Sequence, residues 1–142
     1  MGTNGASIAS YDDLLNALQA LRTANAADPT AAVMSPRTEA TYNKLKDSLG
    51  QPLRRATAIT DLPFLVTSKI PVYETQGTAV GIASRVILGN FAQLMLGIRT
   101  EVRIDLVRET FAANGQYGFI AWMRADVQLM HAASFVQIVG II

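Results

Sequence analysis

The sequence predicts an α+β fold: a mixed sheet flanked by two helices, followed by a C-terminal antiparallel pair of strands. Three observations support this fold class. Two segments in the first fifty residues combine helical periodicity with helix-capping residues, later segments have the apolar or alternating character of strands, and no βαβ rhythm links them. The 142 residues are enough for one domain with its own core, or for one domain and part of another.

The two expected helices span residues 10–23 and 35–50. In the first, a serine can cap the first turn, two aspartates suit the positive end of the helix dipole, and the leucines fall on one face. In the second, Ser35 is a suitable cap, Pro36 suits the first helical position and Gly50 suits the exit. The apolar face of this second helix is expected to contain Tyr42, Leu45 and Leu49.

Short apolar runs predict three strands in the first ninety residues, at 31–34, 62–71 and 85–88. The segments before and after the second of these strands have little pattern and are expected to be loops, at 51–60 and 72–81. The pair Gly89-Asn90 should end the third strand. The following segment, FAQLMLGI, is too short for its periodicity to distinguish a helical turn from a further strand.

The clearest strand pattern lies at residues 99–106, where charged and mainly apolar residues alternate with a period of two. The charges also alternate in sign, which suits a neighbouring strand of opposite pattern. We therefore regard the charged face of this strand as a candidate subunit interface. Its members are Arg99, Glu101, Arg103 and Asp105.

A turn at Asn114-Gly115 is expected to lead into a long strand with one continuous apolar face. This face consists of Tyr117, Phe119, Ala121, Met123, Ala125, Val127 and Leu129. A further turn at residues 131–134 precedes a last strand, FVQIV. We expect these last two strands to pair with each other in antiparallel fashion.

The composition excludes several classes of protein. Half of the residues are hydrophobic and only 16% are charged, against about 25% in typical domains, so part of the surface is expected to be buried against other chains. The net charge of +1 predicts neither specific nucleic-acid binding nor a membrane partner. The longest apolar run, between Arg85 and Arg99, would span about 20 Å as a helix, whereas a bilayer core is about 30 Å thick.

The sequence gives little support for a disulfide framework or for a small catalytic or metal-binding cluster. The absence of cysteine excludes disulfides and thiol chemistry, and no metal-ligand spacing is present. Residues 1–9 lack the pattern of a secretory signal and are expected to form a flexible leader.

Three features leave alternatives open. The single histidine, His131, could serve as a base oriented by Asp126 or Asp105, although no nucleophile motif accompanies it and a turn residue is the simpler interpretation. Trp122 could line a ligand site or belong to a core. Arg54 and Arg55 could contact phosphate or donate salt bridges between subunits. No catalytic, cofactor-binding or metal-binding residues are predicted, and a structural role is favoured over a small hydrolase or a ligand-binding module.

Four stretches carry a resemblance to a known family. They are AAVMSPRTEATYNKLKDSLGQPL, LPFLVTSKIP, RVILGNFAQ and EVRIDLVRETFAANGQYGFIAWMRADVQLMHAASFVQIV. In this order they resemble the major capsid protein of tailed phages, the Hong Kong 97-type shell fold. The first stretch is similar to a strand, a proline-containing cap and a helix ending in Lys-Asp-x-x-Gly-x-x-Leu. The third departs from the family's Gly-Asp-Phe, because Asn90 replaces the aspartate.

The resemblance implies an axial domain over residues 10–97 and the last strands of a peripheral domain over residues 98–142. The family's N-terminal arm, extended loop and spine helix have no counterpart, so the chain resembles the C-terminal half of a capsid protein. It implies self-assembly through pentamers and hexamers, a place in the virion, and assembly in the host cytoplasm, with the missing N-terminal half as a further partner. A nanocompartment shell of the encapsulin kind is the alternative.

Some family members join subunits through a Lys–Asn isopeptide bond. Asn114 matches the turn that holds this asparagine, in a phrase that begins at Phe111. The lysine would come from the extended loop, which has no counterpart here. Asn114 is therefore a crosslink candidate for which a simple turn is the competing interpretation.

Overall fold

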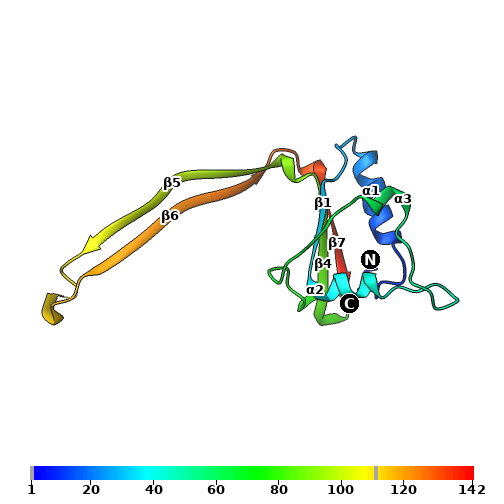
Figure 1. The fold of residues 1–142 in the computed structure, drawn as a ribbon, viewed down its shortest axis with the longest axis horizontal. Coiled ribbons are helices and arrows are strands. Elements are labelled where there is room, and N and C mark those ends of the chain that lie inside the picture. Colours follow the sequence, from blue (N-terminus) through cyan, green and yellow to red (C-terminus); the bar gives the residue numbers. More distant parts are fainter. Residues whose placement is uncertain (1, 111) are drawn as a thin grey trace. The chain divides into compact units, whose positions relative to one another are not determined.

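The computed structural model describes residues 2–110 and 112–142. The chain divides into two compact units. The first contains the residues up to Gln93 together with His131–Ile142, and the second is Leu94–Met130 (Figure 1). Phe111, the first residue of the expected crosslink phrase, lies outside the described residues.

The first unit is built on a five-stranded mixed sheet. Its strands are β1 (Ala31–Met34), β2 (Phe64–Val66), β3 (Glu74–Gln76), β4 (Ala79–Gly89) and β7 (Phe135–Ile141). β1 pairs in parallel with β2 and antiparallel with β4, and both β3 and β7 pair antiparallel with β4. The mixture of parallel and antiparallel pairs, together with helices, confirms the predicted α+β class.

Three helices accompany this sheet: α1 (Asp12–Thr23), α2 (Pro36–Asn43) and α3 (Thr57–Thr60). α1 packs on β4 and β7 and also contacts α3, while α2 contacts β2 (Figure 1). The core lies between α1 and one face of the sheet. Alternate residues of a strand point to the same face, which is why Val86 and Leu88 of β4 are both buried there. The fully buried members of the core include Leu14, Leu21, Met34, Tyr42, Val86 and Leu88.

The first helix is confirmed, including its buried leucine face. The second helix begins as predicted, with Pro36 in the first turn and the Ser35 hydroxyl accepting a hydrogen bond from the Thr38 N–H. Its predicted end at Gly50 is wrong, because α2 stops at Asn43. One carboxylate oxygen of Asp47 accepts the N–H groups of Leu49 and Gln51, both at 2.9 Å, and this local bonding replaces helical bonding.

The predicted pairing of the last two strands is also wrong. β7 pairs along β4 in the first unit, with Val86 opposite Ile138 and Leu88 opposite Val136. Gly89 allows this approach, since a Cβ there would lie only 2.6 Å from the Ser134 carbonyl oxygen and would also meet the Phe135 ring. The segment from His131 onward therefore belongs with the first unit, whereas we expected it to belong with the strands after residue 97.

The first residues are attached to the sheet. The Ala6 N–H donates to the Gly140 carbonyl at 2.9 Å, the Ile142 N–H donates to the Ala6 carbonyl, and Ile8 is buried in the core. The structure thus differs from the free leader expected at residues 1–9. It also differs at both expected loops, which contain α3 in the first case, and β3 with the start of β4 in the second. The segment after Asn90 forms one 3-10 turn and then enters a strand.

Candidate assembly surfaces

The second unit is a two-stranded antiparallel hairpin of β5 (Leu94–Val107) and β6 (Gly118–Leu129). Its register pairs Leu94 with Leu129 at one end and Val107 with Gly118 at the other. Two irregularities interrupt the pairing, between Ile98 and Thr100 and between Thr100 and Arg103, and both add residues to β5. β6 therefore keeps a regular alternation along its whole length.

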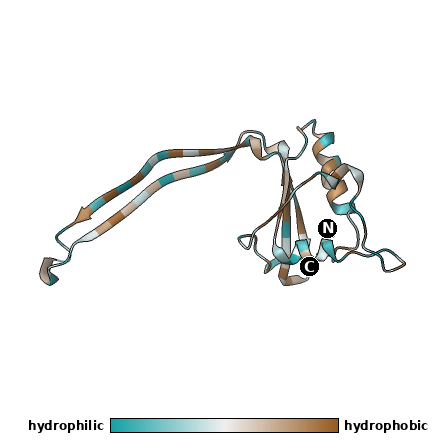
Figure 2. Ribbon diagram, in the orientation of Figure 1, coloured by the Kyte–Doolittle hydropathy of each residue, from teal (hydrophilic) through white to brown (hydrophobic). Residues whose placement is uncertain are grey.

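One face of this hairpin is apolar from end to end, as the sequence predicts for β6. Figure 2 shows hydrophobic positions recurring along both strands. The register places apolar residues of β5 beside those of β6 on this face, as in the pairs Ile98 with Ala125 and Leu106 with Phe119. We call this surface the apolar hairpin face. Its members in the register are Leu94, Leu96, Ile98, Ile104, Leu106, Phe119, Ala121, Ala125, Val127 and Leu129.

The apolar hairpin face is exposed. Phe119 is 71% exposed, Ile104 is 65% exposed and Leu96 is 62% exposed. Of the twenty-one large hydrophobic side chains found exposed among the described residues, fourteen lie in this hairpin. Monomeric soluble proteins rarely leave so continuous an apolar surface uncovered, and such patches mark interaction sites.

The opposite face carries a cluster around the only tryptophan. The Trp122 indole N–H donates to one carboxylate oxygen of Asp105 at 2.9 Å, and the Arg103 Nε–H donates to the other at 2.9 Å. These two bonds, in that order of importance, lower the pKa of Asp105 below its ordinary value. The guanidinium groups of Arg103 and Arg124 lie 5.7 Å and 5.5 Å from the indole centroid, within cation–π range.

Only two of the four residues of the predicted charged face lie together. Arg103 and Asp105 form an ion pair on one face, and both belong to the tryptophan cluster. Arg99 and Glu101 are exposed and lie where the register of β5 shifts. The four residues therefore do not form one uninterrupted charged edge. A bulge cannot be predicted from alternation alone, since it adds a residue without changing the residue types.

The other predicted interface residues lie in different places. Arg55 is half-buried, with its guanidinium carbon 3.7 Å from the centroid of the Phe64 ring, whereas Arg54 is exposed. Asn114 ends a short 3-10 turn between β5 and β6 and is followed by Gly115 in the left-handed conformation. The turn predicted at Asn114-Gly115 is therefore confirmed. None of these placements tests a role in assembly.

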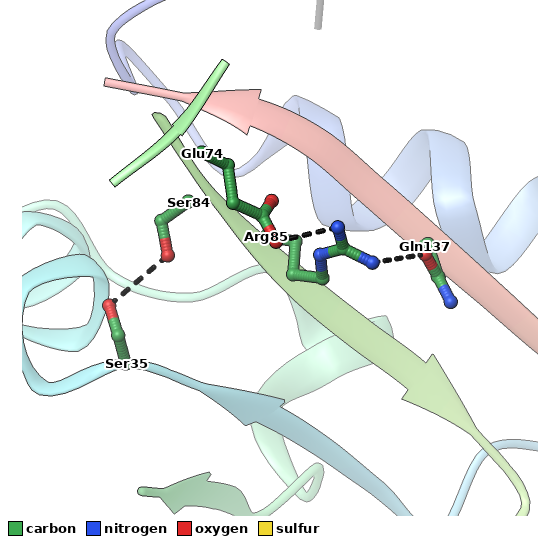
Figure 3. Close-up of polar contacts among 5 residues, drawn as sticks. All are labelled: Ser35, Glu74, Ser84, Arg85 and Gln137. Atoms are coloured by element: carbon green, nitrogen blue, oxygen red, sulfur yellow. Dashed lines mark hydrogen bonds and ion pairs between the residues drawn. The ribbon is translucent and has the colours of Figure 1, made fainter. Parts of the chain in front are cut away.

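One ion pair and two side-chain hydrogen bonds within the first unit were not predicted. Figure 3 shows Arg85 on β4 reaching Glu74 on β3 as an ion pair and the Gln137 side chain on β7, with 3.3 Å between Nη1 and Oε1. The hydroxyl oxygens of Ser35 and Ser84 lie 3.4 Å apart, and a dashed line joins them in Figure 3. Ser35 and Ser84 are fully buried, so their mutual contact satisfies polar groups inside the core. These contacts join β4 to β3, to β7 and to the start of α2, segments that only the folded unit brings together.

The structure offers little support for the alternative chemistries. His131 is exposed beside the short turn that precedes β7, in a shallow pocket whose other lining residues carry no carboxylate. Trp122 is half-buried and engaged by Asp105. Within residues 2–110 and 112–142, no group of three or more histidine, aspartate or glutamate side chains is arranged to hold a metal ion. Over the same residues, no helix has the length and apolarity needed to cross a bilayer.

Comparison with known proteins connects this architecture to one class. The chain is similar to the capsid of an empty GTA particle, with 18% identity and a TM-score of 0.69 over 99% of this chain and 48% of that chain. It is similar to the capsid of Myoviridae phage XM1, with 15% identity and a TM-score of 0.64 over 92% of this chain and 45% of that one. No curated protein matches the chain.

An encapsulin shares the fold. The holo-SrpI encapsulin complex from Synechococcus elongatus matches with 12% identity and a TM-score of 0.62, over 99% of this chain and 51% of that chain. The chain thus spans about half the length of the solved structures that it matches. At these identities the likenesses establish the fold, which is the Hong Kong 97-type shell fold that the sequence resembles.

The family follows from a separate comparison. The model of the phage capsid family matches residues 1–140. The chain therefore belongs to the phage capsid family, as its segment order predicts.

Proposed function

We propose that this chain is a structural component of an icosahedral shell that encloses a phage genome, and that it acts through self-association without catalytic turnover. The observation that carries this proposal is the apolar hairpin face, considered together with membership of the phage capsid family. A shell subunit must keep surfaces for its neighbours, and this chain concentrates such a surface in one element.

The energetics of the hairpin support an assembly role. An isolated two-stranded hairpin is at best marginally stable in water, because it has only one layer and buries little apolar area. The large side chains of its apolar face are 40% to 71% exposed, so covering each of them would contribute about 0.6–2 kcal/mol. A covering partner would therefore stabilise the hairpin and remove the exposed surface at the same time.

The proposal allows two kinds of partner to cover the apolar hairpin face. Copies of this chain, arranged as pentamers and hexamers, are one source of covering surface. The other is the N-terminal half of a longer capsid protein, which is suggested by the chain's match to only about half the length of its structural neighbours. In this proposal the axial domain, expected at residues 10–97, consists of the residues up to Gln93 together with His131–Ile142, and the hairpin Leu94–Met130 supplies strands of the peripheral domain.

Further aspects of the proposal concern place and chemistry. The shell would be assembled in the host cytoplasm and would form the capsid of the virion. The proposed role needs no cofactor, since the shell encloses the genome through contacts between subunits. Arg54, Arg55, Arg99 and Glu101 are candidates for ion pairs between subunits, and Asn114 is a crosslink candidate if a neighbouring lysine can reach it. A nanocompartment shell would use the same fold with a different cargo.

Sedimentation velocity over a wide concentration range, combined with negative-stain microscopy, tests the proposal. We expect concentration-dependent association into closed or curved assemblies. A chain that stays monomeric up to the highest accessible concentration, with the same sedimentation coefficient throughout, would contradict self-assembly of this chain.

A further inference from the structure

A rigid turn at residues 45–53 projects from the first unit (Figure 1). The Leu53 N–H donates to the Leu45 carbonyl at 2.8 Å, and the Asp47 N–H donates to the Gln51 carbonyl at 2.8 Å. The Asp47 carboxylate closes the apex by accepting two further N–H groups. Gly50 adopts φ of +82°, a conformation that glycine tolerates best. The apex conformation is therefore fixed by several hydrogen bonds.

Leu49 stands at this apex and is 82% exposed, the highest value among the large hydrophobic residues found exposed. A single exposed leucine is ordinary on a protein surface. This one is unusual because its backbone is already ordered, so binding through it would cost little further conformational entropy. A rigid apolar projection of this kind suits insertion into a complementary pocket.

The same unit carries a pocket of about 210 Å³, open to solvent, between α1, α3 and the adjoining ends of β1 and β4. We call it the α1–α3 pocket. Its base includes the buried side chains of Leu18, Ile59, Leu62 and Leu88. A dry apolar cavity of about 150 Å³ can hold a benzene molecule, so this volume suffices for a leucine side chain.

The charges around the two features are complementary. Lys44, Lys46 and Arg54 are exposed on the segment that carries Leu49, and the one carboxylate within the turn is engaged in the turn's own hydrogen bonds. The pocket rim carries Asp28 and Asp61, both exposed, against the single cation Arg22, which lies 3.7 Å from Asp28. The projection is therefore net positive and the pocket rim net negative, so the two surfaces are complementary in charge.

We propose that Leu49 of one copy inserts into the α1–α3 pocket of a second copy. The inference rests on the proposed self-association and names one contact that would carry it. Because the projection and the pocket are different surfaces of one unit, the contact is head-to-tail, and repeated head-to-tail contacts close into rings when the rotation permits. Lys46 of the first copy would lie near the acidic rim of the second.

Cysteine crosslinking tests this contact with little background, since the chain has no cysteine of its own. Ser48→Cys places a thiol beside Leu49, and Ala58→Cys places one at the pocket lining; both residues are exposed. The two variants are mixed under mild oxidation, and the disulfide between positions 48 and 58 is quantified by mass spectrometry. The reference pair replaces Ser48→Cys with Thr75→Cys, an exposed position on β3.

We expect the 48–58 disulfide to form about tenfold faster than the reference disulfide, because burying a leucine that is 82% exposed is worth about a tenfold step in affinity. Below saturation, the crosslinking rate follows the fraction of chains in contact. Adding Leu49→Asp to the Ser48→Cys chain should abolish this advantage. Adding Val80→Asp, at a residue 70% exposed elsewhere in the unit, should leave it unchanged.

Equal rates for the two pairs, or an advantage that survives Leu49→Asp, would overturn the inference. If the chain still associates in sedimentation under that outcome, the proposed shell function stands and only this contact is lost. If the chain neither crosslinks selectively nor associates, both are contradicted.

Discussion

Replacing one isoleucine on each face of the hairpin separates assembly from folding. Ile104 belongs to the apolar hairpin face and is 65% exposed, whereas Ile120 lies on the opposite face and is 55% exposed. Threonine is branched at Cβ like isoleucine and suits a strand, so Ile104→Thr and Ile120→Thr form a matched pair. Neither change should alter the free energy of unfolding of the dilute chain by more than about 0.5 kcal/mol, because both sites are exposed.

The expected effect on association differs between the two variants. If a partner covers the exposed 65% of Ile104, its loss removes about 1–2 kcal/mol from each contact, which corresponds to roughly five- to thirty-fold weaker binding. Ile120→Thr should change association by no more than about twofold, the equivalent of about half a kcal/mol. Dissociation constants come from sedimentation velocity, and unfolding free energies from urea titration of dilute samples.

Two results would refute this reasoning. Equal weakening by both substitutions would mean that the apolar hairpin face has no special part in association. A large loss of unfolding free energy in dilute Ile104→Thr would mean that this side chain is already packed within the chain, contrary to its exposure.

Three further predictions concern the two units separately. The pKa of Asp105 is lowered by the hydrogen bonds from Trp122 and Arg103. The contribution of Asp105 to stability is therefore present above about pH 4 and is lost as the pH falls through the lowered pKa. The fluorescence of the single tryptophan should change in that acid step, and Asp105→Asn should abolish the change. Gly89→Ala should lower the free energy of unfolding by about 1–3 kcal/mol or more, because the added Cβ would collide with the Ser134 carbonyl and the Phe135 ring. At Gly97 the nearest atom to an added Cβ is 3.8 Å away, so Gly97→Ala should cost less than about 1 kcal/mol in urea titration. Equal costs would contradict the close approach of β7 to β4. Leu88→Ala should cost about 2–5 kcal/mol in the same assay, because this leucine is fully buried, while Leu65→Ala at a half-exposed site should cost far less; similar values would place Leu88 outside the core.

The parts of the fold that depend on local pattern were predictable. The leucine face of α1 and the proline-capped start of α2 require only neighbouring residues, and both are confirmed. The regular apolar alternation of β6 was predictable for the same reason. Each of these features is determined within a few turns or residues of the chain.

The errors arise where distant residues or single side chains decide. A strand pattern shows which side chains share a face but does not show which strand lies beside it, so β6 and β7 were wrongly paired. The observed pairing requires Gly89, whose missing side chain leaves room for the Ser134 carbonyl and the Phe135 ring, and this requirement is visible only in the folded sheet. Similarly, the helix expected to extend to Gly50 ends earlier, and the Asp47 carboxylate accepts backbone N–H groups of the turn that follows. Leu49 therefore lies exposed at the apex of that turn instead of in the core.

The candidate surfaces show the same division. The apolar hairpin face could be predicted from one strand, because β6 alternates without interruption. The charged face at residues 99–105 could not, because the two register shifts in β5 separate Arg99 and Glu101 from the cluster formed by Arg103 and Asp105. The ties of Arg85 to neighbouring strands depend on the sheet order and have no counterpart in the local sequence.

Hydrogen–deuterium exchange of the hairpin amides, measured at low and high protein concentration, tests the central claim most directly. If the apolar hairpin face is covered on assembly, peptides from β5 and β6 should exchange markedly more slowly in the concentrated, associated sample than in the dilute one. Exchange of these peptides that is identical at both concentrations, in a sample shown to associate, would contradict the claim that this face joins the subunits.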